Sequence, residues 1–238
     1  MSPDELAAVI DHTNLRPEAT AAQIDQLCDE AVEYGFAAVC VNPIWVARCA
    51  ARLGWPVASP GGASAGSRVR IVSVAGFPLG ASRTDTKVDE ARRAIDDGAV
   101  EIDMVVRLGD LVAGNASAVR GDLAAVVETV HAASPAHLLK VILETAALNE
   151  EQMVSGCRWA AQARADFVKT STGFHPAGGA TVDAVRLLHE RASPLQVKAA
   201  GGIRDLATAL AMIEAGASRL GCSTSPRIIQ QAGQSHQA

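Results

Sequence analysis

Short apolar runs, mostly rich in valine and isoleucine, alternate along this chain with longer amphipathic stretches that are rich in alanine. This alternation is typical of repeated βα units, in which parallel strands share one sheet. Eight such units fit into the 238 residues, and eight strands that are each followed by a helix favour a closed (β/α)8 barrel. An open, doubly wound sheet is the alternative, but no G-x-G-x-x-G motif follows the first predicted strand.

These patterns place the elements along the chain. The predicted strands span residues 8–11, 37–41, 70–75, 100–105, 138–143, 166–170, 196–200 and 218–222. The predicted helices span about 20–34, 43–53, 85–97, 116–132, 150–164, 180–191 and 205–215, with a short last helix from about 225. Glycine follows three helices, at Gly35, Gly98 and Gly216, where a helix end favours a left-handed residue. Segment 55–68 is rich in Gly, Ser, Pro and Ala, so we predict a mobile loop there.

Composition limits the architecture and the partners. With 49% hydrophobic residues, the chain can bury one large core, so we predict a single domain over residues 1–238 with a disordered polar tail from about 232 to 238. The net charge of −5 and the absence of a basic stripe argue against nucleic acid and anionic membranes as partners. Five cysteines without a C-x-x-C pair, and no apolar leader, predict a soluble cytoplasmic protein.

Lysine is rare in this chain. Of the 21 basic residues only Lys87, Lys140, Lys169 and Lys198 are lysines, and the last three lie in apolar, strand-like runs. An unpaired buried ammonium is costly, so each of these three needs a partner, a shifted pKa or a chemical function. The alternative is a lysine whose chain extends from a strand end to solvent.

The stretch from Asp166 to Phe174 combines a reactive group with a polar turn. An apolar run leads to Lys169, and three hydroxyl residues and Gly173 follow at once. This order predicts a buried strand that delivers an amine at its C-terminal end, with hydroxyls and amides facing a ligand. Side-chain alternation then predicts a polar layer of Asp103, Lys140, Lys169 and Lys198 where a barrel has its active site. A structural ion network is the alternative.

Two loops have the composition of a phosphate site. Gly201 and Gly202 follow the seventh predicted strand, and Gly221, Ser223 and Thr224 precede the last helix. In many barrels this position binds phosphate through backbone amides, here together with the amide of Gly173. The alternative is that the glycines only form tight turns.

Other chemistries have little support in the sequence. The six histidines form neither an H-x-H nor an H-E-x-x-H cluster, and no G-x-S-x-G motif occurs. We therefore expect no metal and no cofactor. Cys40, at a strand end, either lines the pocket or is a buried structural thiol.

Seven sequence blocks, in order along the chain, carry a family resemblance. They are DHTNL at 11–15, CVNP at 40–43, GFPLG at 76–80, EIDMV at 101–105, KVILET at 140–145, VKTSTGF at 168–174 and KAAGGIR at 198–204. With these blocks the chain resembles the 2-deoxyribose-5-phosphate aldolases, class I (Schiff-base) aldolases on a (β/α)8 barrel.

The resemblance implies a reaction and a set of roles. The reaction is the reversible cleavage of 2-deoxy-D-ribose 5-phosphate to D-glyceraldehyde 3-phosphate and acetaldehyde. Lys169 would form the imine, Lys198 would be its ammonium neighbour, and Asp103 would belong to the proton relay. The resemblance assigns supporting positions to Lys140, Thr170, Asp11, Thr13 and Cys40. Chemistry agrees with these roles, because only a neutral amine attacks a carbonyl and a nearby ammonium lowers the pKa of a lysine.

Two positions depart from the family pattern, and two other functions stay open. Some members end in a tyrosine that reaches the active site, whereas the only tyrosine here is Tyr34, and Phe174 stands where some relatives have a lysine. The alternatives are another phosphosugar class I lyase of transaldolase type and a non-catalytic barrel that binds a phosphosugar. The expected partner is a small phosphosugar, and a homodimer or a larger homo-oligomer is compatible with the sequence.

Overall fold

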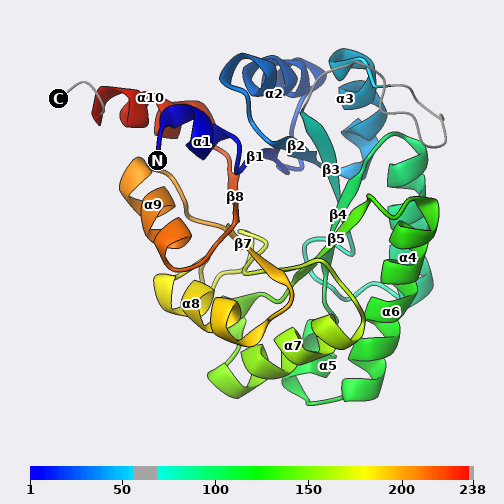
Figure 1. The fold of residues 1–238 in the computed structure, drawn as a ribbon. Helices are drawn as coiled ribbons and strands as arrows, with labels where there is room; N and C mark the ends of the chain where they lie inside the picture. The colour runs from blue at the N-terminus through cyan, green and yellow to red at the C-terminus, as the bar shows by residue number, and fades with distance from the viewer. Residues whose placement is uncertain (56–68, 236–238) are drawn as a thin grey trace.

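The computed structural model describes residues 1–55 and 69–235. Eight parallel strands close into a barrel in the order in which they occur along the chain, and helices surround it (Figure 1). The strands are β1 (Ile10–Asn14), β2 (Ala38–Val41), β3 (Arg70–Ala75), β4 (Glu101–Val105), β5 (Leu138–Ile142), β6 (Phe167–Lys169), β7 (Gln196–Ala200) and β8 (Arg219–Cys222). The predicted (β/α)8 barrel is therefore confirmed.

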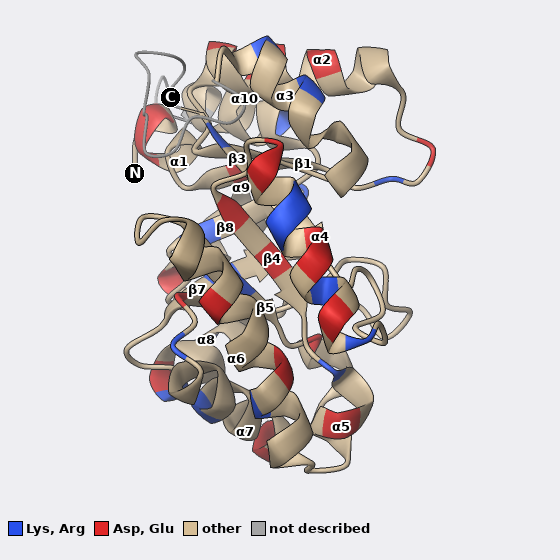
Figure 2. Ribbon diagram, turned by 90° about the vertical axis from the view of Figure 1, so that its right-hand side faces the viewer, with Lys and Arg blue, Asp and Glu red and all other residues tan. Residues whose placement is uncertain are grey.

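The helices follow the predicted alternation. They are α1 (Pro3–Ala7), α2 (Ala21–Tyr34), α3 (Val46–Leu53), α4 (Thr84–Asp96), α5 (Leu108–Val112), α6 (Ala116–Ala133), α7 (Glu150–Gln162), α8 (Val182–Arg191), α9 (Leu206–Glu214) and α10 (Ser225–Ser235), with 3₁₀ turns η1 (Pro43–Trp45) and η2 (Thr145–Ala147). Basic and acidic positions are interspersed along α4 (Figure 2). Within the described residues, no helix is long and apolar enough to cross a membrane.

The bounds of the first strand differ from the prediction. Residues 8–11 were predicted as the strand, but β1 runs from Ile10 to Asn14 and pairs with β2 from Asp11 to Asn14. The polar side chains of His12, Thr13 and Asn14 resemble a turn by hydropathy. They belong to the strand because the C-terminal end of a barrel strand lines the pocket and carries polar side chains. Backbone pairing, rather than side-chain polarity, therefore decides where this strand ends.

Two short helices were not predicted. In α1, Ser2 and Glu5 form a reciprocal capping box, and Pro3 occupies the first turn, so a local start signal was present in the sequence. The five residues of α5 follow β4 without a side-chain cap, so they lack such a signal. The predicted helix over 43–53 is divided into η1 and α3.

The observed ends of several helices can be compared with the predicted ends. Gly35 caps α2 with a left-handed φ of 69°, whereas Gly98 and Gly216 lie one residue beyond the caps of α4 and α9. Helix α10 continues to Ser235, so the prediction of a disordered tail from about 232 was wrong for residues 232–235. Residues 236–238 and almost all of the predicted loop over 55–68 lie outside the described residues.

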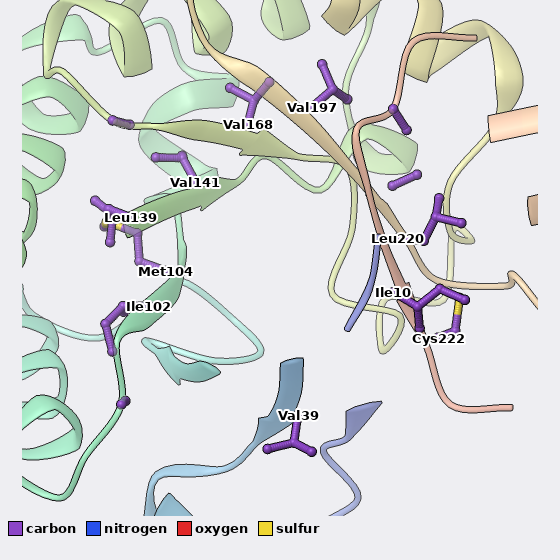
Figure 3. Packing of buried hydrophobic residues seen from close by; sticks show 14 of the residues in the cluster. Ile10, Val39, Ile102, Met104, Leu139, Val141, Val168, Val197, Leu220 and Cys222 are labelled. Atoms are coloured by element: carbon purple, nitrogen blue, oxygen red, sulfur yellow. The ribbon is translucent and has the colours of Figure 1, made fainter. Parts of the chain in front are cut away.

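Two kinds of core lie on the two sides of the sheet. Strand side chains that point outward pack against the helices and form one large apolar cluster, part of which is shown in Figure 3. Inside the barrel, a small apolar cluster of Ala38, Cys40, Val72 and Val74 lies on β2 and β3, together with Leu15. The buried side chains of Asp11, Glu101, Asp103, Lys140, Lys169, Lys198 and Arg219 are charged instead.

Candidate active site

The strand register brings the predicted lysines and Asp103 together. Lys169, the last residue of β6, lies opposite Lys198 of β7, and Asp103 of β4 lies opposite Lys140 of β5. All four residues are at most 2% exposed. Alternation along the strands points these side chains into the barrel, away from the apolar layer under the helices.

Asp103 is the centre of the ion cluster. Its Oδ2 accepts hydrogen bonds from Lys169 Nζ (2.8 Å) and Lys198 Nζ (2.7 Å), and its Oδ1 accepts one from Lys140 Nζ (2.9 Å). Burial alone would raise the pKa of Asp103, but the three ammonium groups hold that pKa well below its usual range. Asp103 is therefore a carboxylate that binds three amines at once.

The other carboxylates pair with the two flanking lysines. Lys198 also donates to Asp11, and Lys140 lies 2.5 Å from Glu101 Oε2. Burial alone would lower the pKa of both lysines, yet the carboxylates around them raise it. Lys140 thus contacts two carboxylates, and its supporting role in the reaction stays a prediction. Among the ion pairs of the described residues, Lys169 takes part in one, with Asp103.

Arg219 completes the cluster and was not predicted. Its Nη1 donates to Asp11 (2.9 Å) and its Nη2 to Glu101 (2.8 Å). Burial opposes the charge of Glu101, but Lys140 and Arg219 nevertheless lower its pKa to about 2. An arginine at the start of the short run Arg219–Cys222 is the same kind of signal as the lysines in their apolar strands, so this residue could have been found. Glu101 shares its strand face with Asp103 and could have been found by alternation.

A pocket of about 510 Å³ opens above this cluster. Lys169 and Thr13 line it, together with all six residues predicted for phosphate binding, namely Gly173, Gly201, Gly202, Gly221, Ser223 and Thr224. Lys198, Asp103, Lys140, Asp11, Cys40 and Thr170 are not among the lining residues. Lys169 is therefore the member of the ion cluster that a ligand can reach.

The glycines allow the loops after β6 and β7 to approach each other. Gly201 has a φ of 89°, and a Cβ added there would lie 3.3 Å from the Cα of Gly173 and 3.1 Å from that of Gly179. A left-handed backbone with so little space favours glycine. Ser223 and Thr224 lie next to this pair of loops in the pocket and directly precede α10. The amides at that helix start are suited to an anion.

Comparisons with known proteins agree with this geometry. A model of the DeoC/LacD aldolase family matches residues 6–231. Deoxyribose-phosphate aldolase of Thermococcus gammatolerans is 49% identical over 229 residues, which cover 96% of each chain. The enzyme of the same name from Brevibacillus brevis is 49% identical over 221 residues, 92% of this chain and 93% of its own. The chain belongs to the DeoC/LacD family of aldolases. The resemblance found in the seven blocks is thereby confirmed.

A solved structure extends the likeness of this aldolase to three dimensions. The deoxyribose-phosphate aldolase from Aeropyrum pernix, described as a tetramer, superposes with a TM-score of 0.83 at 31% identity, covering 96% of this chain and 91% of that one. Among the described residues of this aldolase, no group of three or more His, Cys, Asp or Glu side chains is placed to hold a metal.

The residues that the sequence predicted to support the reaction lie in different surroundings. Thr13 lines the pocket and its hydroxyl donates to the backbone oxygen of Asp11 (2.9 Å). The hydroxyl of Thr170 instead joins β6 to β7, because it donates to Ala200 O (3.1 Å) and accepts from Ala200 N (3.0 Å). Cys40 is fully buried in the small apolar cluster, and burial raises the pKa of its thiol to about 11. Of its two predicted positions, the buried thiol is the one observed.

An aromatic pair lies at the rim. Phe174 is 47% exposed, lines the pocket and packs edge to face on Phe77, with 5.3 Å between the ring centroids. The rim at this point is therefore apolar where the family pattern allows a lysine.

Proposed function

We propose that this aldolase reversibly cleaves 2-deoxy-D-ribose 5-phosphate to D-glyceraldehyde 3-phosphate and acetaldehyde, through an imine on Lys169. The substrate is taken from the names of the Thermococcus gammatolerans and Brevibacillus brevis relatives. The observation that carries the mechanism is that Lys169 lines the pocket while it shares one carboxylate oxygen, Asp103 Oδ2, with Lys198.

Charge balance supports Lys169 as the nucleophile. Four buried cations (Lys140, Lys169, Lys198 and Arg219) contact three carboxylates (Asp11, Glu101 and Asp103). A surplus of positive charge in a buried cluster favours the loss of one proton. Lys140, Lys198 and Arg219 each have two carboxylate partners, whereas Lys169 has one, so Lys169 is the amine that the ion pairs of this cluster hold least.

The reaction then follows from the groups in place. The neutral amine of Lys169 attacks C1 of the open-chain sugar, and loss of water gives an iminium ion. A proton leaves the C3 hydroxyl, the C2–C3 bond breaks, and its electron pair forms an enamine while glyceraldehyde 3-phosphate departs. Protonation at C2 and hydrolysis release acetaldehyde and restore the amine. Asp103, through water, is suited to move these protons, and Lys198, which shares Asp103 Oδ2 with Lys169, lies beside the attacking amine.

Trapping tests this mechanism directly. Acetaldehyde with borohydride should add an ethyl group to Lys169, and Lys169→Arg should remove the label and at least about 99% of the turnover, since a guanidinium is not a usable nucleophile. Peptide mapping by mass spectrometry locates the label. A label on Lys140 or Lys198 would reassign the nucleophile. A label formed only with a ketose phosphate would favour the transaldolase-type lyase, and no label with either compound would favour a binding barrel.

The phosphate loops can be tested by charge. Ser223→Asp should raise the KM for the phosphorylated sugar about fivefold, because two like charges 4 Å apart in water repel by about 1 kcal/mol. Ser223→Ala is the matched control, which shortens the side chain without adding charge. Activity on free 2-deoxyribose should change much less, and an equal loss on both sugars would place the phosphate elsewhere.

We further propose that the enzyme acts in the cytoplasm, in deoxyribonucleotide catabolism, as a homo-oligomer. All five cysteines are free and buried, which supports a reducing compartment. The Aeropyrum pernix relative is described as a tetramer, which supports self-association. Light scattering after size exclusion would measure the mass of the assembly, and a monomer at micromolar concentration would refute the last point.

A further inference from the structure

Glu144 is a buried acid that the mechanism above does not use. It follows β5 after one residue and is 2% exposed. Its backbone is left-handed, with φ 61° and ψ 57°, a conformation that is uncommon for any residue except glycine. Among the ion pairs of residues 1–55 and 69–235, none involves Glu144. A disfavoured backbone beside an active site is a reason to ask what the side chain does.

Among residues 1–55 and 69–235, the hydrogen bonds of its carboxylate go to one residue of the pocket, Thr172. Oε2 accepts a hydrogen bond from the hydroxyl of Thr172 (2.5 Å), and Oε1 accepts one from the backbone N–H of Thr172 (3.1 Å). Thr172 lies three residues after Lys169 and lines the same pocket. Glu144 therefore fixes the orientation of a group that faces the substrate.

The bonds of the Thr172 hydroxyl can be counted. A threonine hydroxyl has one hydrogen to donate and two lone pairs to accept. The hydrogen goes to Glu144, and one lone pair accepts from the backbone N–H of Phe174 (3.1 Å). One lone pair is left for a ligand. Towards the pocket, this hydroxyl therefore accepts hydrogen bonds and does not donate them.

We propose that Glu144 is a positioning residue that makes Thr172 a reader of substrate hydroxyl groups. With its hydrogen held by Glu144, Thr172 stabilises an acceptor aldehyde that carries a hydroxyl near the reacting carbon. It gives no such support to an aldehyde that has only hydrogens or a carbonyl there. This inference rests on the proposed aldol reaction and adds to it a determinant of substrate choice.

The test uses the synthetic direction and two acceptors. Acetaldehyde is condensed with glyceraldehyde 3-phosphate, whose C2 hydroxyl can donate to Thr172, or with 2,3-dioxopropyl phosphate, whose C2 carbonyl can only accept. In Glu144→Gln, the amide oxygen can still accept the N–H of Thr172, while the NH₂ donates to its hydroxyl and turns the hydroxyl hydrogen into the pocket. We expect the ratio of kcat/KM for the two acceptors to fall about tenfold, the size of one buried hydrogen bond.

Variants of Thr172 separate positioning from folding. Thr172→Val, of similar shape, should lower the same ratio, and Thr172→Ser should preserve it. Adding Glu144→Gln to Thr172→Val should change the ratio no further, because the two residues act through one hydroxyl. Equal losses with both acceptors in Glu144→Gln would show a structural role and overturn the proposal.

Trapping of acetaldehyde keeps this inference distinct from the proposed function. Acetaldehyde has no hydroxyl, so its reaction with Lys169 reports on the lysine and not on Thr172. If wild-type Lys169 is not trapped, the imine mechanism fails and this inference fails with it. If Lys169 is trapped in every variant but the acceptor ratio of Glu144→Gln equals that of the wild type, only the role of Glu144 is wrong. These variants also keep the test open if Glu144→Gln does not fold.

Discussion

The four lysines of this chain form two kinds of buried site. Lys87 lies in the helical layer, where its Nζ donates to Asp122 Oδ2 (2.7 Å) and to the carbonyl oxygen of Val105 (2.9 Å). Asp122 accepts a further bond from the hydroxyl of Thr84. One cation thus faces one carboxylate, and both groups are buried between α4 and α6.

Inside the barrel the same residue type has a different environment. Three lysines share Asp103, and with Arg219 they exceed the carboxylates that they contact by one charge. Burial lowers the pKa of Lys87 in spite of Asp122, whereas carboxylates raise the pKa of Lys140 and Lys198 against the effect of burial. Burial of a lysine therefore does not mark a reactive amine. We propose that the mark of a reactive amine is instead a surplus of cations around an amine that lines a pocket, as at Lys169.

The largest effect should come from breaking the balanced pair. Lys87→Met keeps the length of the side chain but leaves the Asp122 carboxylate buried without its cation, which should lower the free energy of unfolding by about 3–5 kcal/mol. Urea unfolding measures this loss. The double variant Lys87→Met, Asp122→Leu should recover much of it. At a temperature where the variant is folded, acetaldehyde should still be trapped on Lys169, and loss of trapping would show that Lys87 also serves the reaction.

The comparison also explains what could be predicted from the sequence. Lys140, Lys169 and Lys198 were identified because a lysine interrupts an apolar run, and alternation then placed them with Asp103. Lys87 lies in the polar-looking stretch that forms α4, so its burial has no local signal. It follows from α6 packing on α4, a contact between residues 35 positions apart.

Other parts of the site depend on register in the same way. Thr170 was predicted beside the ligand, but its position relative to β7 turns its hydroxyl towards Ala200. The contact of Glu144 with Thr172 needs a left-handed residue after β5, which no glycine signals in the sequence. Composition and periodicity therefore predicted the barrel and the charged layer, whereas the individual hydrogen bonds depend on how neighbouring strands align.

A smaller effect is expected from removing one charge of the surplus. Lys198→Leu should slow imine formation about tenfold at neutral pH and shift its pH profile upward by about one unit, because an ammonium next to Lys169 no longer favours the neutral amine. Stopped-flow measurement of imine formation across pH gives the profile. Lys87→Met is the matched control, since it removes a buried lysine outside the cluster. An unchanged profile in Lys198→Leu would assign Lys198 to structure alone.

The smallest expected effect is on the pH dependence of unfolding in acid, through the carboxyl group of Glu101. The pKa of Glu101 is lowered from 4.5 to about 2 in the folded chain, so the unfolded chain binds the proton first as the pH falls. The stabilisation from this group is complete above the unfolded pKa and is lost as the pH falls through the folded one, between about 4.5 and 2. Glu101→Gln cannot titrate, so it should flatten the pH dependence of unfolding in this window by at most about 1.4 kcal/mol per pH unit.

A comparison of variants separates the contribution of Glu101, in the buried cluster, from that of carboxylates at the surface. Urea unfolding of the wild type and Glu101→Gln, measured at intervals from pH 5 to the lowest pH at which both fold, gives the two slopes. Asp25→Asn is the control, because Asp25 pairs with Arg48 at the surface and exposed pairs contribute little. Parallel slopes for wild type and Glu101→Gln would mean that Lys140 and Arg219 do not hold Glu101 ionised. The buried cluster would then hold one charged carboxylate fewer than the ion pairs indicate.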